Sequence, residues 1–226
     1  MHIIKTNKNK LNLSKLNTCL NYTLRQATLE DAFEIWSVMD TCSKTMVQKE
    51  HFICDDLNYV KDILSGHGFG VVACDLDGNI VGNLLVKYPR LNEENLGYDV
   101  FTTFSKNTFQ NISINSNHHP ILTQTDSYKK QSDCNIALTC ENLNRVVHMD
   151  SASVHPNHRG HSLERQMIAF AETLLDTSKY QYSFATVAPE NTASLKSLER
   201  NGYQVMVIKQ KYGGLMRCVM MKELMK

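Results

Sequence analysis

The chain has 226 residues, of which 42% are hydrophobic, a size that suits one well-packed domain better than two full-sized ones. Its 24 lysines and arginines nearly balance 23 aspartates and glutamates, so the net charge of +1 gives no overall field that would draw it to nucleic acid or to anionic lipid. No apolar run approaches the roughly eighteen residues of a membrane span, and the N-terminus lacks the apolar core of a secretory signal. We therefore expect a cytoplasmic protein with a small-molecule partner.

The cysteines argue against a disulfide framework and against a cysteine-rich zinc site. They are odd in number, scattered, and include no C-x-x-C pair. We expect reduced, mostly packing thiols at Cys19, Cys42, Cys54, Cys74, Cys134, Cys140 and Cys218.

Residues 1–21 are rich in lysine and asparagine and contain no acidic residue, which predicts a flexible tail. A weak organellar targeting segment is the alternative, although arginine is absent. Residues 22–226 are predicted to form the single domain.

The first regular elements are a strand from Tyr22 and a helix after Thr28. Thr28 is a good N-cap, Asp31 follows three residues later, and apolar residues then recur at helical spacing. A second helix is expected near Leu57 to Leu64, ended by Gly66. The strands 70–75 and 79–88 flank Asp77-Gly78, which favours a tight antiparallel hairpin.

Residues 102–135 are polar and show little periodicity, so we expect a surface insertion, either a plain connector or a substrate-covering loop. The pattern after it predicts strands at 146–154, 182–188, 203–208 and 215–221 and helices at 163–175 and 191–200. These elements predict an α/β fold with a mixed sheet and helices on both faces.

The turn between residues 154 and 163 is the most informative segment. Pro156 ends the strand, Gly160 permits close backbone approach, and the next helix begins with amides that have no partner within the helix. The positive end of the helix dipole and Arg159 also favour an anion such as a pyrophosphate. The alternative is an ordinary strand-turn-helix junction, since one glycine is no phosphate-loop fingerprint.

Four motifs in chain order resemble the GNAT superfamily of N-acetyltransferases. Val154-x-Pro156-x-x-Arg159-Gly160-x-Ser162-Leu163 is similar to its acetyl-CoA-binding motif A. The other three are Leu24-Arg25-x-Ala27 with Asp31, Asp77-Gly78-x-Ile80-Val81-Gly82, and Pro189-Glu190-Asn191-x-x-Ser194 followed by Gly202-Tyr203. The resemblance covers about residues 22–224 and implies a mostly antiparallel central sheet flanked by helices.

The resemblance implies acetyl-CoA as co-substrate and no metal. It places the cofactor contacts at Ala152, Ser153, Val154, Arg159, Gly160, His161, Ser162, Leu163, Glu164, Arg165 and Asn191. The sequence departs from the family pattern at Ser162, where glycine is frequent, and at Glu164, where a small residue is frequent. It also has Leu198 where the family commonly has a tyrosine that protonates the leaving thiolate.

His148 and Asp150 are the candidate general bases. They lie two residues apart on one strand, so they are expected to share a face, and a histidine beside a carboxylate could titrate near neutral pH. A base of the histone-acetylating branch lies near the position of His148, whereas a hydrogen-bonded structural role is the alternative for both residues. The source of the proton for the leaving thiolate is left open among Tyr203, Tyr212, Ser197 and water. Tyr203 is taken as the catalytic candidate.

Three further groups of residues complete the candidates. Asp99 and Glu141 are lower-ranked acceptor contacts, and residues 211–214 are expected to form a hairpin turn. His155, His158 and His161 have a spacing that suggests a metal site, but a solvated loop rim is favoured because no carboxylate or cysteine completes the set.

The resulting hypothesis is acetyl transfer from acetyl-CoA to a primary amine of a small molecule, by direct attack in a ternary complex. The alternatives are a non-catalytic acyl-CoA-binding module and a protein N-acetyltransferase. We expect no nucleic-acid or membrane partner, and a homodimer is left open.

Overall fold

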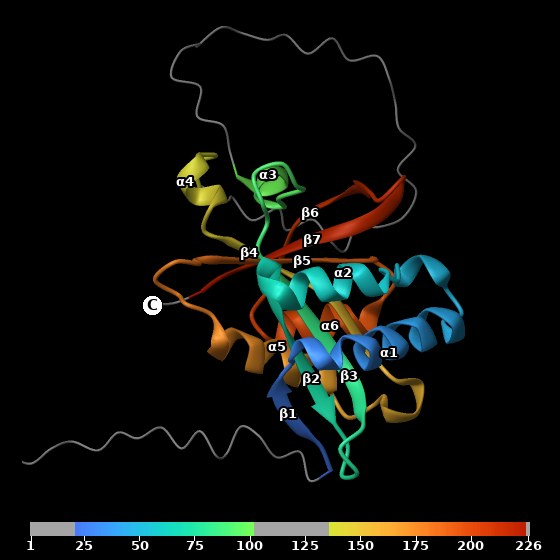
Figure 1. The fold of residues 1–226 in the computed structure, drawn as a ribbon. Helices are drawn as coiled ribbons and strands as arrows, with labels where there is room; N and C mark the ends of the chain where they lie inside the picture. Colours follow the sequence, from blue (N-terminus) through green and yellow to red (C-terminus); the bar gives the residue numbers. More distant parts are fainter. Residues whose placement is uncertain (1–20, 102–135, 225–226) are drawn as a thin grey trace, which may run out of the picture.

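The computed structural model describes residues 21–101 and 136–224. The predicted tail, apart from Asn21, and the predicted insertion at 102–135 therefore lie outside the described residues. Within the described part, seven strands form one sheet in the order β1-β2-β3-β4-β5-β7-β6 (Figure 1). The strands are β1 (Thr23–Gln26), β2 (Gly68–Cys74), β3 (Ile80–Lys87), β4 (Val146–Val154), β5 (Tyr182–Val187), β6 (Gln204–Lys211) and β7 (Leu215–Glu223).

Every neighbouring pair in this sheet is antiparallel except β4 and β5, which are parallel. A parallel pair needs a crossover, and here α5 (Leu163–Leu174) supplies it. The mixed, mostly antiparallel sheet that the sequence predicts is confirmed.

The remaining helical segments join the strands or pack on the sheet. They are η2 (Leu29–Asp31), α1 (Ala32–Thr45), η3 (Lys49–His51), α2 (Leu57–Asp62), η4 (Ile63–His67), α3 (Gly97–Val100), α4 (Cys140–Leu143), η5 (Pro156–His158) and α6 (Thr192–Arg200). The predicted cap is present, because the Thr28 amide donates to the Asp31 carboxylate at 2.7 Å. Asp31 also accepts two hydrogen bonds from Arg25, which ties β1 to the start of the helical segment.

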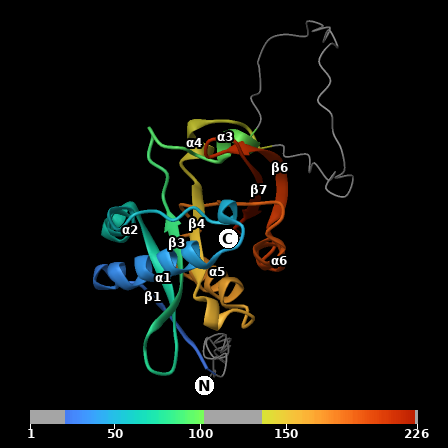
Figure 2. The same ribbon diagram turned by 90° about the vertical axis from the view of Figure 1, so that its right-hand side faces the viewer.

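The alternation of β2 explains why the sheet has helices on both faces. Val71 and Ala73 pack in one core cluster with Met167 of α5, whereas Val72 and Cys74 pack in another with Ile35 of α1. Figure 2 shows α1 and α2 on one side of β3 and α5 on the other. A third cluster, which includes Phe184 and Phe101, lies beneath the short helices α3 and α4.

The structure differs from the predicted boundaries at several places. The second helix runs past Asp62 in a wider π-type turn, and Gly66 ends the regular helical conformation with a φ of 120°, as predicted. The last hairpin is longer than predicted, with β6 and β7 paired as far as Lys211 and Leu215. The helices α3 and α4 lack any strong sequence pattern and were not predicted.

No helix among residues 21–101 and 136–224 combines the length and the apolar character that crossing a membrane requires.

Candidate active site

The central feature of the site is a gap between β4 and β5. These strands pair only at Val146–His148 against Tyr182–Phe184, although β4 runs on to Val154 and β5 to Val187. The amide of His155 donates to Val81 of β3 at 2.8 Å. Since successive strand amides point to opposite edges, those of Ala152 and Val154 point away from β3 and into the gap.

A cavity of about 860 Å³ follows this gap. One end, which we call the turn end, lies at residues 158–165 and the start of α6. The other end, which we call the carboxylate end, is lined by Asp55, Tyr59, Asp150 and Tyr212. A single cavity therefore connects the predicted anion-binding turn with a group of acidic and phenolic side chains.

The turn end is built from main-chain amides. The first amide of α5 that donates a hydrogen bond within the helix is that of Gln166, which donates to the Ser162 carbonyl oxygen at 3.1 Å. The amides of residues 160–165 make no hydrogen bond with the described residues. Gly160 (φ 86°) and Ser162 (φ 58°) both take left-handed conformations, which turn the chain sharply into the helix. A run of unpaired amides at a helix N-terminus suits a phosphate group.

Side chains around the turn end leave these amides open. Arg159 is exposed and lines the cavity, with Nε 3.4 Å from the Val154 carbonyl oxygen. Glu164, where the family frequently has a small residue, accepts a hydrogen bond from Ser194 of α6. Burial raises the pKa of Glu164, which favours its neutral form beside an anion. Asn191 caps α6 by accepting from the Ser194 amide at 3.3 Å, as predicted.

The three histidines of the turn do not converge on one point. His155 accepts from the Asn157 amide, His158 pairs with Tyr22 Oη at 3.2 Å, and His161 packs on the Tyr22 ring. Among the described residues, no group of three or more His, Cys, Asp or Glu side chains is placed to hold a metal ion.

The carboxylate end begins at a bulge in β4. Leu84 pairs with Ala152 but Val86 pairs with Met149, so Asp150 and Ser151 together oppose one residue of β3. Strict alternation therefore fails at this point, but His148 and Asp150 both line the cavity. The bulge allows Asp150 to be exposed and line the cavity while Ser151, the next residue, is buried.

Hydrogen bonds hold the Asp150 carboxylate in place. Tyr59 Oη donates to it at 2.6 Å, and Ser151 Oγ lies 3.3 Å from it and 2.8 Å from Asp55. Loss of hydration raises the pKa of both Asp150 and Asp55, because it disfavours the charged carboxylate. Both acids are thus shifted toward the range in which a carboxylate can accept a proton near neutral pH.

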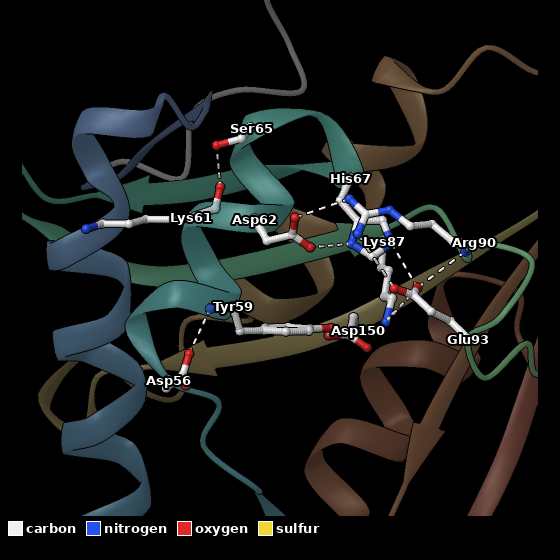
Figure 3. Close-up of polar contacts among 10 residues, drawn as sticks. All are labelled: Asp56, Tyr59, Lys61, Asp62, Ser65, His67, Lys87, Arg90, Glu93 and Asp150. Carbon is white, nitrogen blue, oxygen red and sulfur yellow. Dashed lines mark hydrogen bonds and ion pairs between the residues drawn. The ribbon is translucent and has the colours of Figure 1, made fainter.

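An ionic network stands behind Tyr59 (Figure 3). Lys87 Nζ lies 5.6 Å from the centre of the Tyr59 ring and 3.2 Å from Glu93. Glu93 in turn contacts the buried His67, which pairs with Asp62 at 2.6 Å. The network fixes Lys87 near Asp150, where its charge partly offsets the effect of burial on the carboxylate.

His148 does not have the properties predicted for a general base. It is buried, and its Nε2 accepts a hydrogen bond from the Leu96 amide at 3.1 Å. Burial lowers its pKa to about 3, so the expectation of titration near neutral pH is wrong. A neutral ring that accepts through Nε2 carries its proton on Nδ1 and has no lone pair left for a substrate proton.

Of the candidates for protonating the leaving thiolate, one lies in the core and the others line the cavity. Tyr203 packs in the core and its hydroxyl pairs with Ser183 at 2.6 Å, so the structure does not place this predicted donor in the cavity lining. Tyr212, Ser197 and Leu198 all line the cavity. Tyr212 pairs with Thr186 of β5 at 2.9 Å, and burial raises the pKa of its hydroxyl.

The lower-ranked candidates also lie outside the cavity. Asp99 pairs with Lys209 and Lys211, and Glu141 pairs with Arg145. Ser153, predicted as a cofactor contact, lines the cavity but donates its hydroxyl to Asn83. Asp99, Glu141 and Ser153 therefore each have a structural partner within the protein.

Sequence reasoning missed Asp55, Tyr59 and Arg217, which line the cavity. Asp55 and Asp56 precede a helix, where an acidic residue is accounted for by capping, and Asp56 does accept from the Tyr59 amide. Arg217 lies in a strand predicted as the edge of a hairpin. No spacing in the sequence connects these residues with Asp150.

Neither protein-family models nor curated protein sequences yield a match to this chain at the significance level required. Solved protein structures do match this chain. The yncA protein of Salmonella typhimurium, described as an acetyltransferase and solved with its cofactor acetyl-CoA, matches with a TM-score of 0.57 and 16% identity over 91% of this chain and 95% of its own.

Two further structures give similar values. A GNAT-superfamily phosphinothricin acetyltransferase from Sinorhizobium meliloti, in complex with acetyl-CoA, has a TM-score of 0.55 and 13% identity over 90% of this chain and 88% of its own. The ribosomal-protein-S18-alanine N-acetyltransferase of Escherichia coli has a TM-score of 0.54 and 9% identity over 90% and 94%. The chain therefore has the fold of the GNAT-superfamily acetyltransferases.

Proposed function

We propose that this protein transfers an acetyl group from acetyl-CoA to a primary amine of a small molecule. The observation that carries the proposal is the run of unpaired amides at residues 160–165, opening into the gap between β4 and β5. The cavity joins that run to ionisable side chains that can exchange protons. Two solved structures of the same fold contain acetyl-CoA, which supports the same co-substrate here.

The turn end is the proposed site of the pyrophosphate. Its amides and Arg159 supply hydrogen-bond donors, and the packing of Leu163 and Met167 in the core keeps α5 fixed on the sheet. The pantetheine arm would then lie in the gap, against the amides of Ala152 and Val154. One of these amides would stabilise the charge that develops on the thioester oxygen during attack.

Asp150 is the proposed general base. It takes one proton from the acceptor's ammonium, directly or through one water, and the neutral nitrogen forms a bond to the acetyl carbon. The carbon–sulfur bond breaks and the thiolate takes up a proton from a donor in the site. The acylated nitrogen then loses its remaining extra proton, which restores that donor, and Asp150 releases its own proton to solvent. Tyr59 orients the Asp150 carboxylate through the 2.6 Å hydrogen bond, and the raised pKa of Asp150 brings its basicity closer to that task.

Tyr212 is the proposed proton donor to the thiolate. It lines the cavity, and its raised pKa keeps the hydroxyl protonated at neutral pH. Leu198, at the position where the family resemblance implies a tyrosine, cannot supply a proton. The assignment accordingly moves from α6 to the turn between β6 and β7.

Calorimetry with coenzyme A tests the donor site, using Gly160→Asp with Gly160→Asn as its matched control. Both variants place a similar side chain at a left-handed position with open space around it, but only aspartate adds a negative charge. Repulsion of the pyrophosphate should weaken binding at least about tenfold relative to the asparagine variant. Equal affinities would remove the turn from the binding site.

Thiol release from acetyl-CoA with a panel of amines tests catalysis. Acetylation of at least one small amine supports the proposal, and tight coenzyme A binding without turnover on any amine or peptide would instead favour a binding module. Turnover restricted to peptide N-termini would favour a protein acetyltransferase.

A further inference from the structure

Arg217 is a buried cation that faces the cavity. It lies on β7, only 4% of its surface is exposed, and it lines the cavity. A guanidinium cannot lose its charge inside a protein, so burial is costly unless an anion or several acceptors compensate it.

The described residues give Arg217 only partial compensation. Nη1 donates to the Met216 carbonyl at 2.9 Å and Nη2 donates to the Glu50 carbonyl. Within the described ranges, no ion pair includes Arg217. The guanidinium has further N–H donors that these two carbonyls do not use.

Its position is at the carboxylate end rather than the turn end. The contact with Glu50 places Arg217 against the loop between α1 and α2, and its guanidinium carbon lies 5.7 Å from the centre of the Tyr212 ring. Burial is the main cause of the raised pKa of Tyr212, and the charges of Glu94 and Asp150 add to it. Tyr212 therefore lies beside the buried cation and lines the same cavity as the proposed general base.

The other cations of this region already have partners. Lys211 pairs with Glu94 and Asp99, and Lys87 pairs with Glu93. Among the described residues at the carboxylate end, Arg217 has no ion-pair partner, which suits a ligand with one negative charge. Asp55 and Asp150 provide the opposite charge for an ammonium group.

We propose that Arg217 binds the carboxylate of the acceptor, so that the substrate class is an amino acid whose ammonium lies at Asp150. This proposal rests on the acetyl transfer proposed above. Planar carboxylates suit the two-pronged donor geometry of arginine, and binding both ends of the acceptor would orient its nitrogen toward the thioester.

The first experiment compares acceptors on the unmodified protein. L-amino acids and amino acids with longer spacing, such as β-alanine, are each paired with the amine that lacks the carboxylate. We expect kcat/KM to be about 30-fold or more higher for the carboxylate-bearing member of the best pair. Amines bearing a phosphate ester form a third arm, and a preference for them would replace the carboxylate assignment.

The second experiment uses Arg217→Met, with Arg217→Lys as the charge-retaining variant and Arg145→Met as the matched control. Arg145 pairs with Glu141 outside the cavity, so its loss should leave kcat/KM unchanged. Arg217→Met should raise KM for the amino acid about 30-fold or more and change kcat/KM for its carboxylate-free partner far less, and lysine should restore part of the loss. Coenzyme A affinity should stay within about threefold, since the turn end is intact.

A measurement without any variant covers the case in which Arg217→Met does not fold. Carboxylic acids that lack the amine should inhibit competitively against the acceptor, and the corresponding amides should not. Turnover of amines with no preference for a carboxylate, together with no such inhibition, would overturn the inference while leaving acetyl transfer intact. Absence of coenzyme A binding would instead overturn the proposed function.

Discussion

The two ends of the cavity are built from different parts of the chain. The turn end uses main-chain amides of one continuous segment, residues 160–165. The carboxylate end uses side chains from β4, from α2 and the loop before it, and from the β6–β7 turn, which meet only in the folded protein. Main-chain groups are present whatever the side chain, so the turn end should tolerate most substitutions that keep its backbone conformation. The carboxylate end should not.

The largest expected effect tests the proposed base at the carboxylate end. Asp150→Asn keeps the size of the side chain and removes its ability to accept a proton, so kcat should fall about 100- to 1,000-fold. Coenzyme A affinity should be unchanged when measured by calorimetry. Asp176→Asn, in an exposed turn where the carboxylate accepts hydrogen bonds from Ser178, is the matched control and should keep full activity.

The pH profile of the same variant gives an independent test. A base works in its deprotonated form, so wild-type kcat/KM should rise with pH through the raised pKa of Asp150. The asparagine variant should lose that rise. An unchanged profile together with nearly full activity would show that Asp150 is a structural residue.

Two tyrosine variants should have a smaller effect on kcat, and they distinguish a catalytic tyrosine in the cavity from a structural one in the core. Tyr212→Phe removes the proposed proton donor and should lower kcat about tenfold at little cost in stability. Tyr203→Phe leaves the buried Ser183 hydroxyl without its partner and should lower the free energy of unfolding by about 1 kcal/mol, with kcat unchanged. Denaturant unfolding and steady-state rates measured together check both. The reverse pattern would return the catalytic role to Tyr203.

The smallest effect is expected from Glu164→Gln at the turn end. Removing a carboxylate near the proposed pyrophosphate, while keeping a hydrogen-bond acceptor for Ser194, should strengthen coenzyme A binding about two- to fivefold above neutral pH. A weaker affinity would indicate that Glu164 holds the turn in place by its charge.

The same variant has a predicted effect on stability. Because the pKa of Glu164 is raised in the folded state, its stabilising contribution is complete below the unfolded pKa and is lost as pH rises through the folded one. Thermal unfolding of Glu164→Gln should therefore show a weaker fall in stability with rising pH than the wild type.

Most of the fold could be predicted because local patterns determine it. The 163–175 stripe predicted α5 to within one residue, and the Asp77-Gly78 turn predicted the pairing of β2 with β3. The turn from β4 into α5 could also be predicted, since Pro156, Gly160 and the helix start are contiguous. The low pKa of His148 could not be predicted, because its burial and its hydrogen bond with the Leu96 amide depend on residues 52 positions apart in the chain.

The sequence alone determined the order of strands and helices and the position of the turn with unpaired amides, because periodicity, capping and backbone freedom are properties of neighbouring residues. Only the tertiary structure decided which ionisable groups face the cavity. The bulge at Asp150 and Ser151, the burial of His148 and Tyr203, and the approach of Tyr59 and Arg217 all depend on packing between distant segments. The protonation state of an ionisable side chain depends on its solvation and on nearby charges, and the packing of the folded chain determines both of these.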